Sequence, residues 1–219
     1  MFDKRELLKN VNVCVDFTLL SPLVTEKDIK KHCNIALKHH YYGVCINPVN
    51  VKIAKRYIQT ELLKDIKVCT VIGYPLGENV SQIKIQEAKQ AISDGVDELD
   101  VVISISRVKS GDYAYVKNEL TRIVRISKKR VVKAIIETGY LTREEINKVV
   151  KICLKCRVDY IQTSTGYTLT RSTPEEVNYL DNLVGERCGI KIAGGVTTKA
   201  EAIEMVRAGA QRIGTSRII

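Results

Sequence analysis

The sequence predicts an α/β fold, a single (β/α)8 TIM barrel that spans residues 1–219 and carries a short N-terminal helix. Eight short apolar runs alternate with stretches of helical periodicity, and the unit repeats every 22 to 32 residues, roughly. No G-x-G-x-x-G follows the first run, which counts against an open, doubly wound sheet. Since no linker or low-complexity stretch is visible, a single domain is expected.

The apolar runs are the expected parallel strands, because a strand covered on both faces reads as continuously apolar. They occupy residues 11–20, 43–48, 67–75, 98–104, 130–139, 158–166, 189–195 and 212–217. Helical periodicity lies between them, at 25–40, 50–60, 80–94, 112–128, 142–155, 174–185 and 198–208. Little sequence follows the eighth run, so any closing helix is expected from residues 2–10.

Residues at the helix ends support these boundaries. Thr142 precedes Glu145 at the spacing of a capping box, and Pro174 stands where a helix opens. Gly95 and Gly209 directly follow two predicted helices, where glycine ends a helix at low steric cost.

The composition, 45% hydrophobic and 27% charged, is that of a soluble globular protein. A charged N-terminus and the lack of a membrane-length apolar run predict a cytoplasmic protein with no membrane partner. Seven cysteines are scattered without metal-ligand spacing, and the pair Cys153-x-x-Cys156 stands alone. We therefore expect buried or half-buried thiols rather than a metal or redox centre.

The net charge of +10 makes nucleic acid one candidate partner. However, the lysines alternate with glutamates on helical faces, and stacking aromatic residues are few. We expect no nucleic-acid partner, but a solvated surface with a bias towards small anions.

Polar residues interrupt the apolar runs, and a buried polar residue is costly unless it is paired. They are Asp16, Asn47, Asp100, Ser104, Lys133, Glu137, Gln162 and Lys191. Asp100, Lys133 and Lys191 could simply satisfy one another as buried ion pairs. Because such pairs stabilise less than apolar packing, function is the favoured interpretation for these three. For Asp16 and Glu137, structure and function stay equally open.

Small residues end the last two predicted strands. Gly194 and Gly195 follow the seventh strand, and Gly214 and Ser216 end the eighth. Barrel enzymes commonly bind phosphate with these two loops, through backbone N–H groups. Gly166, which follows Thr-Ser-Thr, would form a third side of the same phosphate-binding site. The alternative is a set of tight turns with no ligand.

The chain resembles the deoxyribose-phosphate aldolase family from its first strand to its last. The matching stretches are DFTLLSP, VCINP, VCTVIGYPLG, DELDVVIS, KAIIETGYLT, YIQTSTG, GIKIAGGVTT and RIGTSR. The resemblance implies a carbon–carbon lyase of deoxyribonucleotide catabolism, which reversibly cleaves 2-deoxyribose 5-phosphate to acetaldehyde and glyceraldehyde 3-phosphate. It also implies a lysine Schiff base, no metal or cofactor, a phosphorylated small sugar or aldehyde as ligand, and a homodimer.

Residue by residue, the resemblance assigns roles to the site. Lys191 matches the second lysine, which lowers the pKa of the nucleophile and aids proton transfer, and Asp100 matches the aspartate of the proton relay. Cys45 and Thr165 match the pocket wall. The phosphate cradle corresponds to Gly194, Gly195, Gly214 and Ser216, with Gly166 beside them.

The family's Schiff-base lysine belongs at position 162, where this chain has Gln162. An imine requires a primary amine with a free lone pair, and an amide nitrogen has none to offer. Other positions depart from the family as well, namely Phe17, Ser21, Ser104, Tyr167, Thr197 and Arg217.

Four hypotheses follow from this departure. In the first, Lys191 takes over as the nucleophile of an aldolase. In the second, the barrel is a pseudoenzyme that binds a sugar phosphate without cleaving it, as a sensor or partner subunit. In the third, position 162 was altered to trap a complex. In the fourth, an isomerase uses Asp100 and Glu137 as acid and base, with Lys191 as the electrophile.

Overall fold

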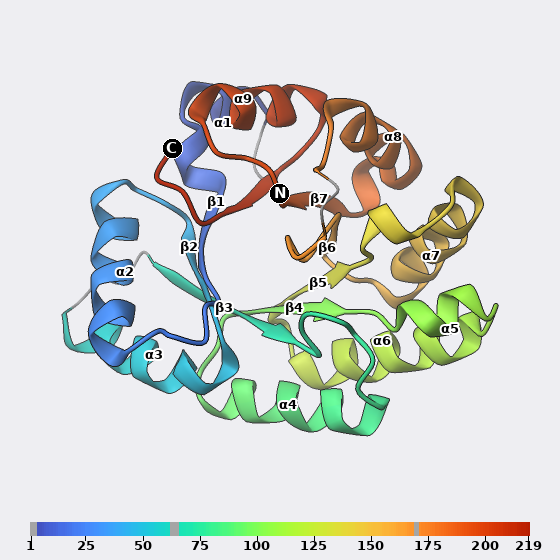
Figure 1. Cartoon of the computed structure of the whole chain (residues 1–219), viewed down its shortest axis with the longest axis horizontal. Helices are drawn as coiled ribbons and strands as arrows, with labels where there is room; N and C mark the ends of the chain where they lie inside the picture. The colour runs from blue at the N-terminus through green and yellow to red at the C-terminus, as the bar shows by residue number, and fades with distance from the viewer. Residues whose placement is uncertain (1–3, 62–65, 169–170) are drawn as a thin grey trace.

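Eight parallel strands close into a barrel, as the repeat of apolar runs predicts. The structure is a computed structural model that describes residues 4–61, 66–168 and 171–219. The strands follow one another around the barrel in chain order, and the eighth pairs with the first to close it. Figure 1 shows the helices arranged around this ring of strands. The predicted (β/α)8 architecture is therefore confirmed.

Each strand occupies part of a predicted apolar run. The strands are β1 (Val15–Leu19), β2 (Gly43–Ile46), β3 (Lys67–Ile72), β4 (Glu98–Val102), β5 (Val131–Ile135), β6 (Tyr160–Gln162), β7 (Gly189–Ala193) and β8 (Arg212–Thr215). Most are shorter than predicted because the last residues of the run leave the ladder and form a loop. In β6 the strand ends at Gln162, and the residues from Thr163 onwards form the turn that follows.

The helices fall in the predicted intervals, with short additions. They are α1 (Lys4–Lys9), α2 (Glu26–Lys38), α3 (Val51–Thr60), α4 (Ser81–Ser93), α5 (Ile105–Lys109), α6 (Tyr113–Ser127), α7 (Arg143–Cys156), α8 (Pro174–Val184) and α9 (Lys199–Ala208). Four 3-10 turns accompany them, η1 (Val11–Cys14), η2 (Pro48–Asn50), η3 (Thr138–Tyr140) and η4 (Gly185–Arg187). Helix α5 and the 3-10 turns were not predicted, because they are too short to show helical periodicity.

The predicted helix ends are present in the structure. Thr142 and Glu145 form both hydrogen bonds of a capping box at α7, and Pro174 opens α8. Gly209 directly follows α9 at φ 125°. Helix α1 packs against α9, as expected for a closing helix from residues 2–10, although residues 2 and 3 lie outside the described residues (Figure 1).

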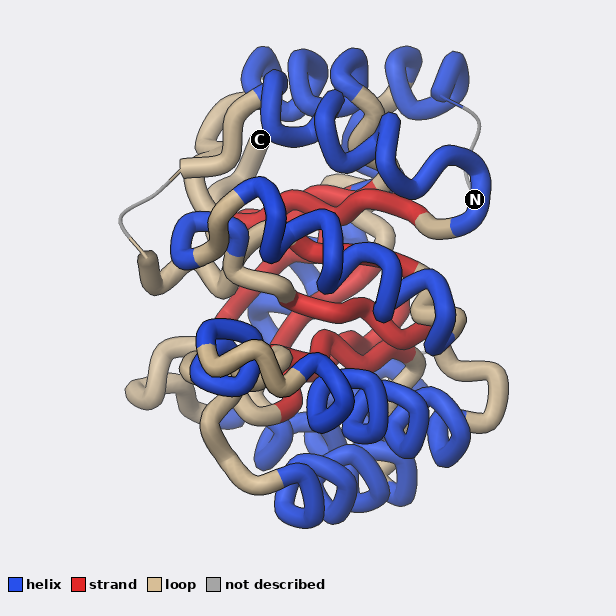
Figure 2. The backbone as a smooth tube through the Cα atoms, turned by 90° about the vertical axis from the view of Figure 1, so that its right-hand side faces the viewer, coloured by secondary structure: helices blue, strands red, loops and turns tan. Residues whose placement is uncertain are grey.

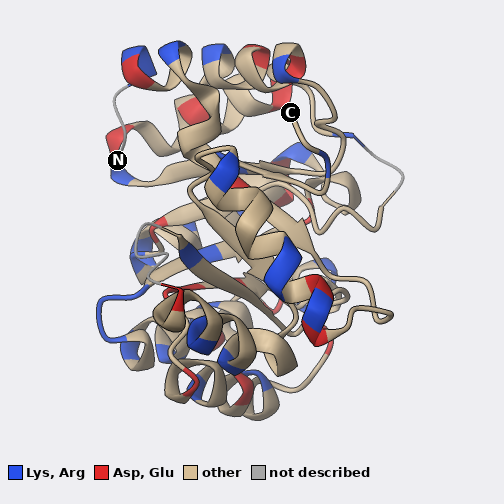
Figure 3. Cartoon of the chain, turned by 90° about the vertical axis from the view of Figure 1, so that its left-hand side faces the viewer, with Lys and Arg blue, Asp and Glu red and all other residues tan. Residues whose placement is uncertain are grey.

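The main hydrophobic core lies between the barrel and the helices, which Figure 2 shows outside the strands. A small second cluster consists of Cys45, Cys69 and Val71. Because the strands are parallel, their carboxyl ends meet at one rim, and the loops after them lie together there. The seven cysteines are buried free thiols, as predicted. None of the helices in the described part of the chain has the length and apolarity needed to cross a bilayer. Figure 3 shows basic and acidic positions interspersed over the helices.

Candidate active site

Six charged side chains meet inside the barrel, and we call them the central ion cluster. They are Asp16, Glu98, Asp100, Lys133, Lys191 and Arg212, and each side chain is at most 2% exposed. Three carboxylates face three cations, so the cluster is formally neutral. Neutrality matters here because an unpaired buried charge is far more costly than a paired one.

Asp100, on β4, lies between two lysines. Its Oδ2 atom is 2.5 Å from Lys191 Nζ, and its Oδ1 atom is 2.7 Å from Lys133 Nζ. Lys191 Nζ also lies 2.7 Å from Asp16 Oδ2, and Lys133 Nζ lies 2.5 Å from Glu98 Oε2. The ion pairs considered for these residues from the sequence are therefore formed, and Asp16 belongs to the same network.

Arg212 holds the end of the cluster nearer the amino ends of the strands. Its Nη1 atom is 2.7 Å from Asp16 Oδ1 and 3.1 Å from Glu98 Oε2. The guanidinium carbon lies 3.5 Å from the ring centroid of Tyr42 and 5.3 Å from that of Tyr160. Sequence reasoning missed Arg212 and Glu98, since both stand at the first residue of a strand. The available sequence signal for Arg212 was an arginine at the start of an apolar strand.

Lys191 is held as an ammonium by its neighbours. Burial by itself lowers the pKa of Lys191, but the carboxylates of Asp100 and Asp16 outweigh it and raise that pKa above the ordinary lysine value. Burial likewise raises the pKa of Asp16, and the charges of Arg212, Lys191 and Lys133 together bring it below the ordinary value. Lys191 is consequently a cation and a hydrogen-bond donor near neutral pH.

Gln162 lies beside Lys191 on the next strand, at the paired position of the β6–β7 ladder. Its side chain is 4% exposed. The amide Nε2 donates to the backbone carbonyl of Ser164 at 2.8 Å. The amide oxygen Oε1 is buried and has no hydrogen-bond partner among the described residues. Gln162 and Lys191 thus lie on adjacent strands, and Asp100, on β4, reaches Lys191 across the interior of the barrel.

A pocket of about 390 Å³ opens at the carboxyl ends of the strands, and we call it the mouth pocket. Its lining includes six predicted binding residues, Thr165, Gly166, Gly194, Gly195, Gly214 and Ser216. Among the described residues of this lining, Arg217 is the only charged one. Cys45, the remaining predicted wall residue, lies deeper, with its Sγ atom 3.8 Å from Asp100 Oδ2.

Glycines allow the mouth pocket to lie directly on the central ion cluster. A Cβ atom on Gly214 would come within 3.3 Å of Lys191 Cε, so the floor of the pocket lies against the lysine side chain. Gly194 and Gly195 have φ values of 83° and 106°, which L-residues with side chains rarely adopt. These backbone conformations leave the strand ends uncovered towards the pocket.

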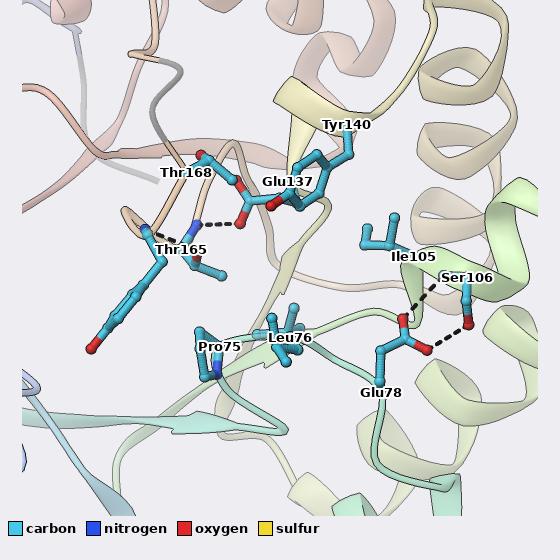
Figure 4. Close-up of a pocket in the computed structure, with 11 residues that line it drawn as sticks. Pro75, Leu76, Glu78, Ile105, Ser106, Glu137, Tyr140, Thr165 and Thr168 are labelled. Carbon is cyan, nitrogen blue, oxygen red and sulfur yellow. Dashed lines mark hydrogen bonds between the residues drawn. The ribbon is translucent and has the colours of Figure 1, made fainter.

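Glu137 shapes the turn that follows β6. Its Oε2 atom accepts a hydrogen bond from the Thr165 backbone N–H at 2.9 Å, and its Oε1 atom accepts one from the Thr168 hydroxyl at 3.0 Å (Figure 4). Its own backbone is left-handed, at φ 48°. Of the two interpretations left open for Glu137, these contacts support the structural one.

A second cavity, of about 280 Å³, lies on the other side of this turn. Apolar residues line most of it, with Glu78 and Glu137 as its two acids (Figure 4). Glu137 therefore faces this cavity, whereas Asp100 lies in the central ion cluster. Neither residue is part of the lining of the mouth pocket, so the acid and base of the isomerase hypothesis do not face one shared pocket.

Four of the residues predicted to depart from the family pattern, Ser21, Tyr167, Thr197 and Arg217, line the mouth pocket. Phe17 faces helix α2, where its ring stacks on the His32 ring with centroids 4.0 Å apart. The predicted departures therefore include side chains that would contact a ligand in the mouth pocket.

A glycine-lined pocket above a buried lysine–aspartate pair, at the carboxyl rim of a closed parallel barrel, is the arrangement of a (β/α)8 barrel enzyme. The comparison with known families agrees, since the model of the DeoC/LacD family aldolases matches residues 2–216. The chain belongs to this family, which is a family of carbon–carbon lyases.

Individual relatives resemble nearly the whole chain. A deoxyribose-phosphate aldolase of Thermococcus kodakarensis is 44% identical over 98% of this chain and 94% of its own length. One of Caldanaerobacter subterraneus subsp. tengcongensis is 42% identical over 99% of this chain and 94% of its own length. Among solved structures, the aldolase QR15 has a TM-score of 0.89 at 40% identity, covering 94% of this chain and 91% of its own. A tetrameric deoxyribose phosphate aldolase of Aeropyrum pernix has a TM-score of 0.87 at 30% identity, covering 95% and 88% of the two chains.

Proposed function

We propose that this barrel binds a phosphorylated sugar or aldehyde of the deoxyribose-phosphate type in the mouth pocket, and that its aldol chemistry is strongly impaired. The observation that carries the proposal is Gln162 on β6, an amide at the position where the family's reaction needs an amine. Of the four hypotheses raised by the sequence, this is the second, a pseudoenzyme with a retained ligand site.

Backbone N–H groups and one cation support phosphate binding. The loops after β7 and β8 carry Gly194, Gly195 and Ser216, whose backbone lines the mouth pocket. Arg217 adds a positive charge, the only formal charge that the described residues bring to that lining. An anion of the size of a phosphate therefore meets a favourable potential at this end of the pocket.

Lys191 does not replace the missing amine near neutral pH. An imine forms only with the unprotonated amine, and an ordinary lysine is about 0.1% unprotonated at pH 7.5. Asp100 and Asp16 raise the pKa of Lys191 further, so its reactive fraction is smaller still. Lys191 and Asp100 are instead arranged to hold and orient a ligand oxygen beneath the pocket floor.

A cytoplasmic location remains a prediction from the sequence composition, and a link to deoxyribonucleotide catabolism and a homodimer remain predictions from the family resemblance. The Aeropyrum pernix relative is described as tetrameric, so larger assemblies occur among related proteins.

Binding and imine trapping, measured together, test the proposal. Titration calorimetry with 2-deoxyribose 5-phosphate should give a binding isotherm. Borohydride treatment of the same mixture, followed by peptide mass spectrometry, should give no site-specific adduct. Lys191→Ala serves as the control for slow labelling of surface lysines. An adduct that maps to Lys191 in the parent protein would favour the first hypothesis, an aldolase whose nucleophile has moved one strand.

A further inference from the structure

The Gln162 amide has a buried acceptor without a partner. One of the two N–H groups of its Nε2 atom donates to the Ser164 carbonyl at 2.8 Å. Its Oε1 atom is buried without a hydrogen-bond partner among the described residues. A buried polar atom of this kind is rare in folded proteins and indicates an unfilled partner position.

The orientation of the amide is determined by its neighbour. If the amide were rotated by half a turn, Oε1 would face the Ser164 carbonyl oxygen, and two acceptors would lie at hydrogen-bonding distance without a proton between them. Nε2 must therefore face Ser164, and Oε1 must be the atom left over. The second N–H of Nε2 remains a donor, but only a ligand group that itself donates can pair with Oε1.

The free oxygen belongs to the layer just beneath the mouth pocket. Gln162 is the ladder partner of Lys191, and Lys191 lies against Gly214 in the pocket floor. Lys191 uses its ammonium on Asp100 and Asp16, and no hydrogen bond joins it to Gln162 among the described residues. A group that reaches below the floor beside Lys191 would meet a cationic donor on one side and a neutral acceptor on the other.

We propose that Gln162 makes the site selective for a hydroxyl-bearing phosphosugar, a polyol phosphate or cyclic hemiacetal phosphate, in place of a free aldehyde. A hydroxyl can donate to Gln162 Oε1 and accept from Lys191 at the same time, whereas a carbonyl oxygen can only accept. This inference rests on the proposed function, because the phosphate must be held in the mouth pocket for the other end of the ligand to reach Gln162.

Two ligands that differ by one hydroxyl group test the inference on the unmodified protein. We would measure the dissociation constants of 2-deoxyribitol 5-phosphate and of its 1-deoxy analogue, which keeps the phosphate and lacks the terminal hydroxyl. The expected result is that the alcohol binds about tenfold more tightly, the size expected for one additional buried hydrogen bond. Gln162→Met, which has similar length and no amide oxygen, should bring the two constants together. Arg217→Ala should weaken both ligands by the same factor and keep their ratio.

The outcomes separate the two proposals. If both phosphates bind the unmodified protein equally well, the proposed phosphosugar site stands and the role of Gln162 is wrong, with water as the partner of its oxygen. If Gln162→Met keeps the tenfold preference, another acceptor reads the hydroxyl and the inference also fails. If neither compound nor 2-deoxyribose 5-phosphate binds, the proposed function itself fails. Because the ligand pair is compared first on the unmodified protein, the test does not depend on the folding of a variant.

Discussion

Gln162→Lys is expected to give the barrel a reactive amine, and the central ion cluster sets how reactive it becomes. The new lysine would start from the buried position of Gln162, beside Lys191 on the next strand. In the parent protein the cluster holds three acids and three cations, so a protonated lysine would add an uncompensated positive charge. The cluster should therefore favour the neutral amine, which is the form that attacks a carbonyl.

The size of this effect can be worked out from the sheet geometry. Neighbouring strands lie about 5 Å apart. At about that distance, two like charges repel by roughly 3 kcal/mol for an effective dielectric constant of about 20. At ~1.4 kcal/mol per pKa unit, this repulsion lowers the pKa of the new lysine by about two units, from ~10.4 to ~8. Burial lowers it further and Asp100 offsets part of the change, so the unprotonated fraction at pH 7.5 should rise from ~0.1% to about 20%.

The assay is the pH dependence of borohydride trapping with 2-deoxyribose 5-phosphate, with the adduct mapped to position 162. Gln162→Met is the matched control without an amine. Combining Gln162→Lys with Lys191→Met removes the neighbouring cation and leaves an excess of acid, so trapping should move to more alkaline pH. A folded Gln162→Lys protein that traps with an apparent pKa near that of ordinary lysine, unchanged by Lys191→Met, would refute the electrostatic reasoning.

Three further changes test other parts of the structure. Arg217→Ala should weaken binding of 2-deoxyribose 5-phosphate about tenfold and flatten its salt dependence, since it removes the one charge that the described residues bring to the pocket lining. Arg217→Lys should retain most of the affinity, and equal binding by all three proteins in calorimetry would contradict this. Glu137→Ala should lower the free energy of unfolding, measured in urea, by about 2–4 kcal/mol, because it leaves the Thr165 N–H without its acceptor. Glu137→Gln should lower it less. A loss below about 1 kcal/mol for Glu137→Ala would count against the turn-shaping role. Burial lowers the pKa of His32 to about 4, so the contribution of neutral His32 to the free energy of unfolding is complete above pH ~6.5. That contribution is lost as the pH falls towards 4, by up to ~3 kcal/mol. His32→Gln should lessen this acid-induced loss of stability in urea titrations, and an unchanged pH profile would show that another group causes it.

Residues far apart in the sequence could be grouped into one predicted site because consecutive parallel strands are neighbours in the barrel. Gln162 and Lys191 end up side by side since each lies near the end of one of two consecutive parallel strands. Glu98 and Arg212 were missed because each lies at the first residue of its strand, where a charge usually faces solvent. Only their side-chain contacts show that both turn inwards. Equally, no sequence pattern could reveal that the Gln162 amide uses its donor on Ser164, because that depends on one rotamer.

Because of the central ion cluster, the presence of Lys191 and Asp100 alone does not indicate activity. The family resemblance predicts that Lys191 and Asp100 are a catalytic pair, yet each also contributes to the charge balance of the cluster. Removal of Lys191 alone would leave three buried acids facing two cations, a change that typically costs about 3–5 kcal/mol. Charge balance in the folded protein therefore favours both residues, whether or not the barrel forms an imine. With Gln162 the buried charges balance, whereas a protonated lysine there would add a fourth cation. We therefore expect position 162 to distinguish an active aldolase from a binding barrel better than Lys191 or Asp100 does.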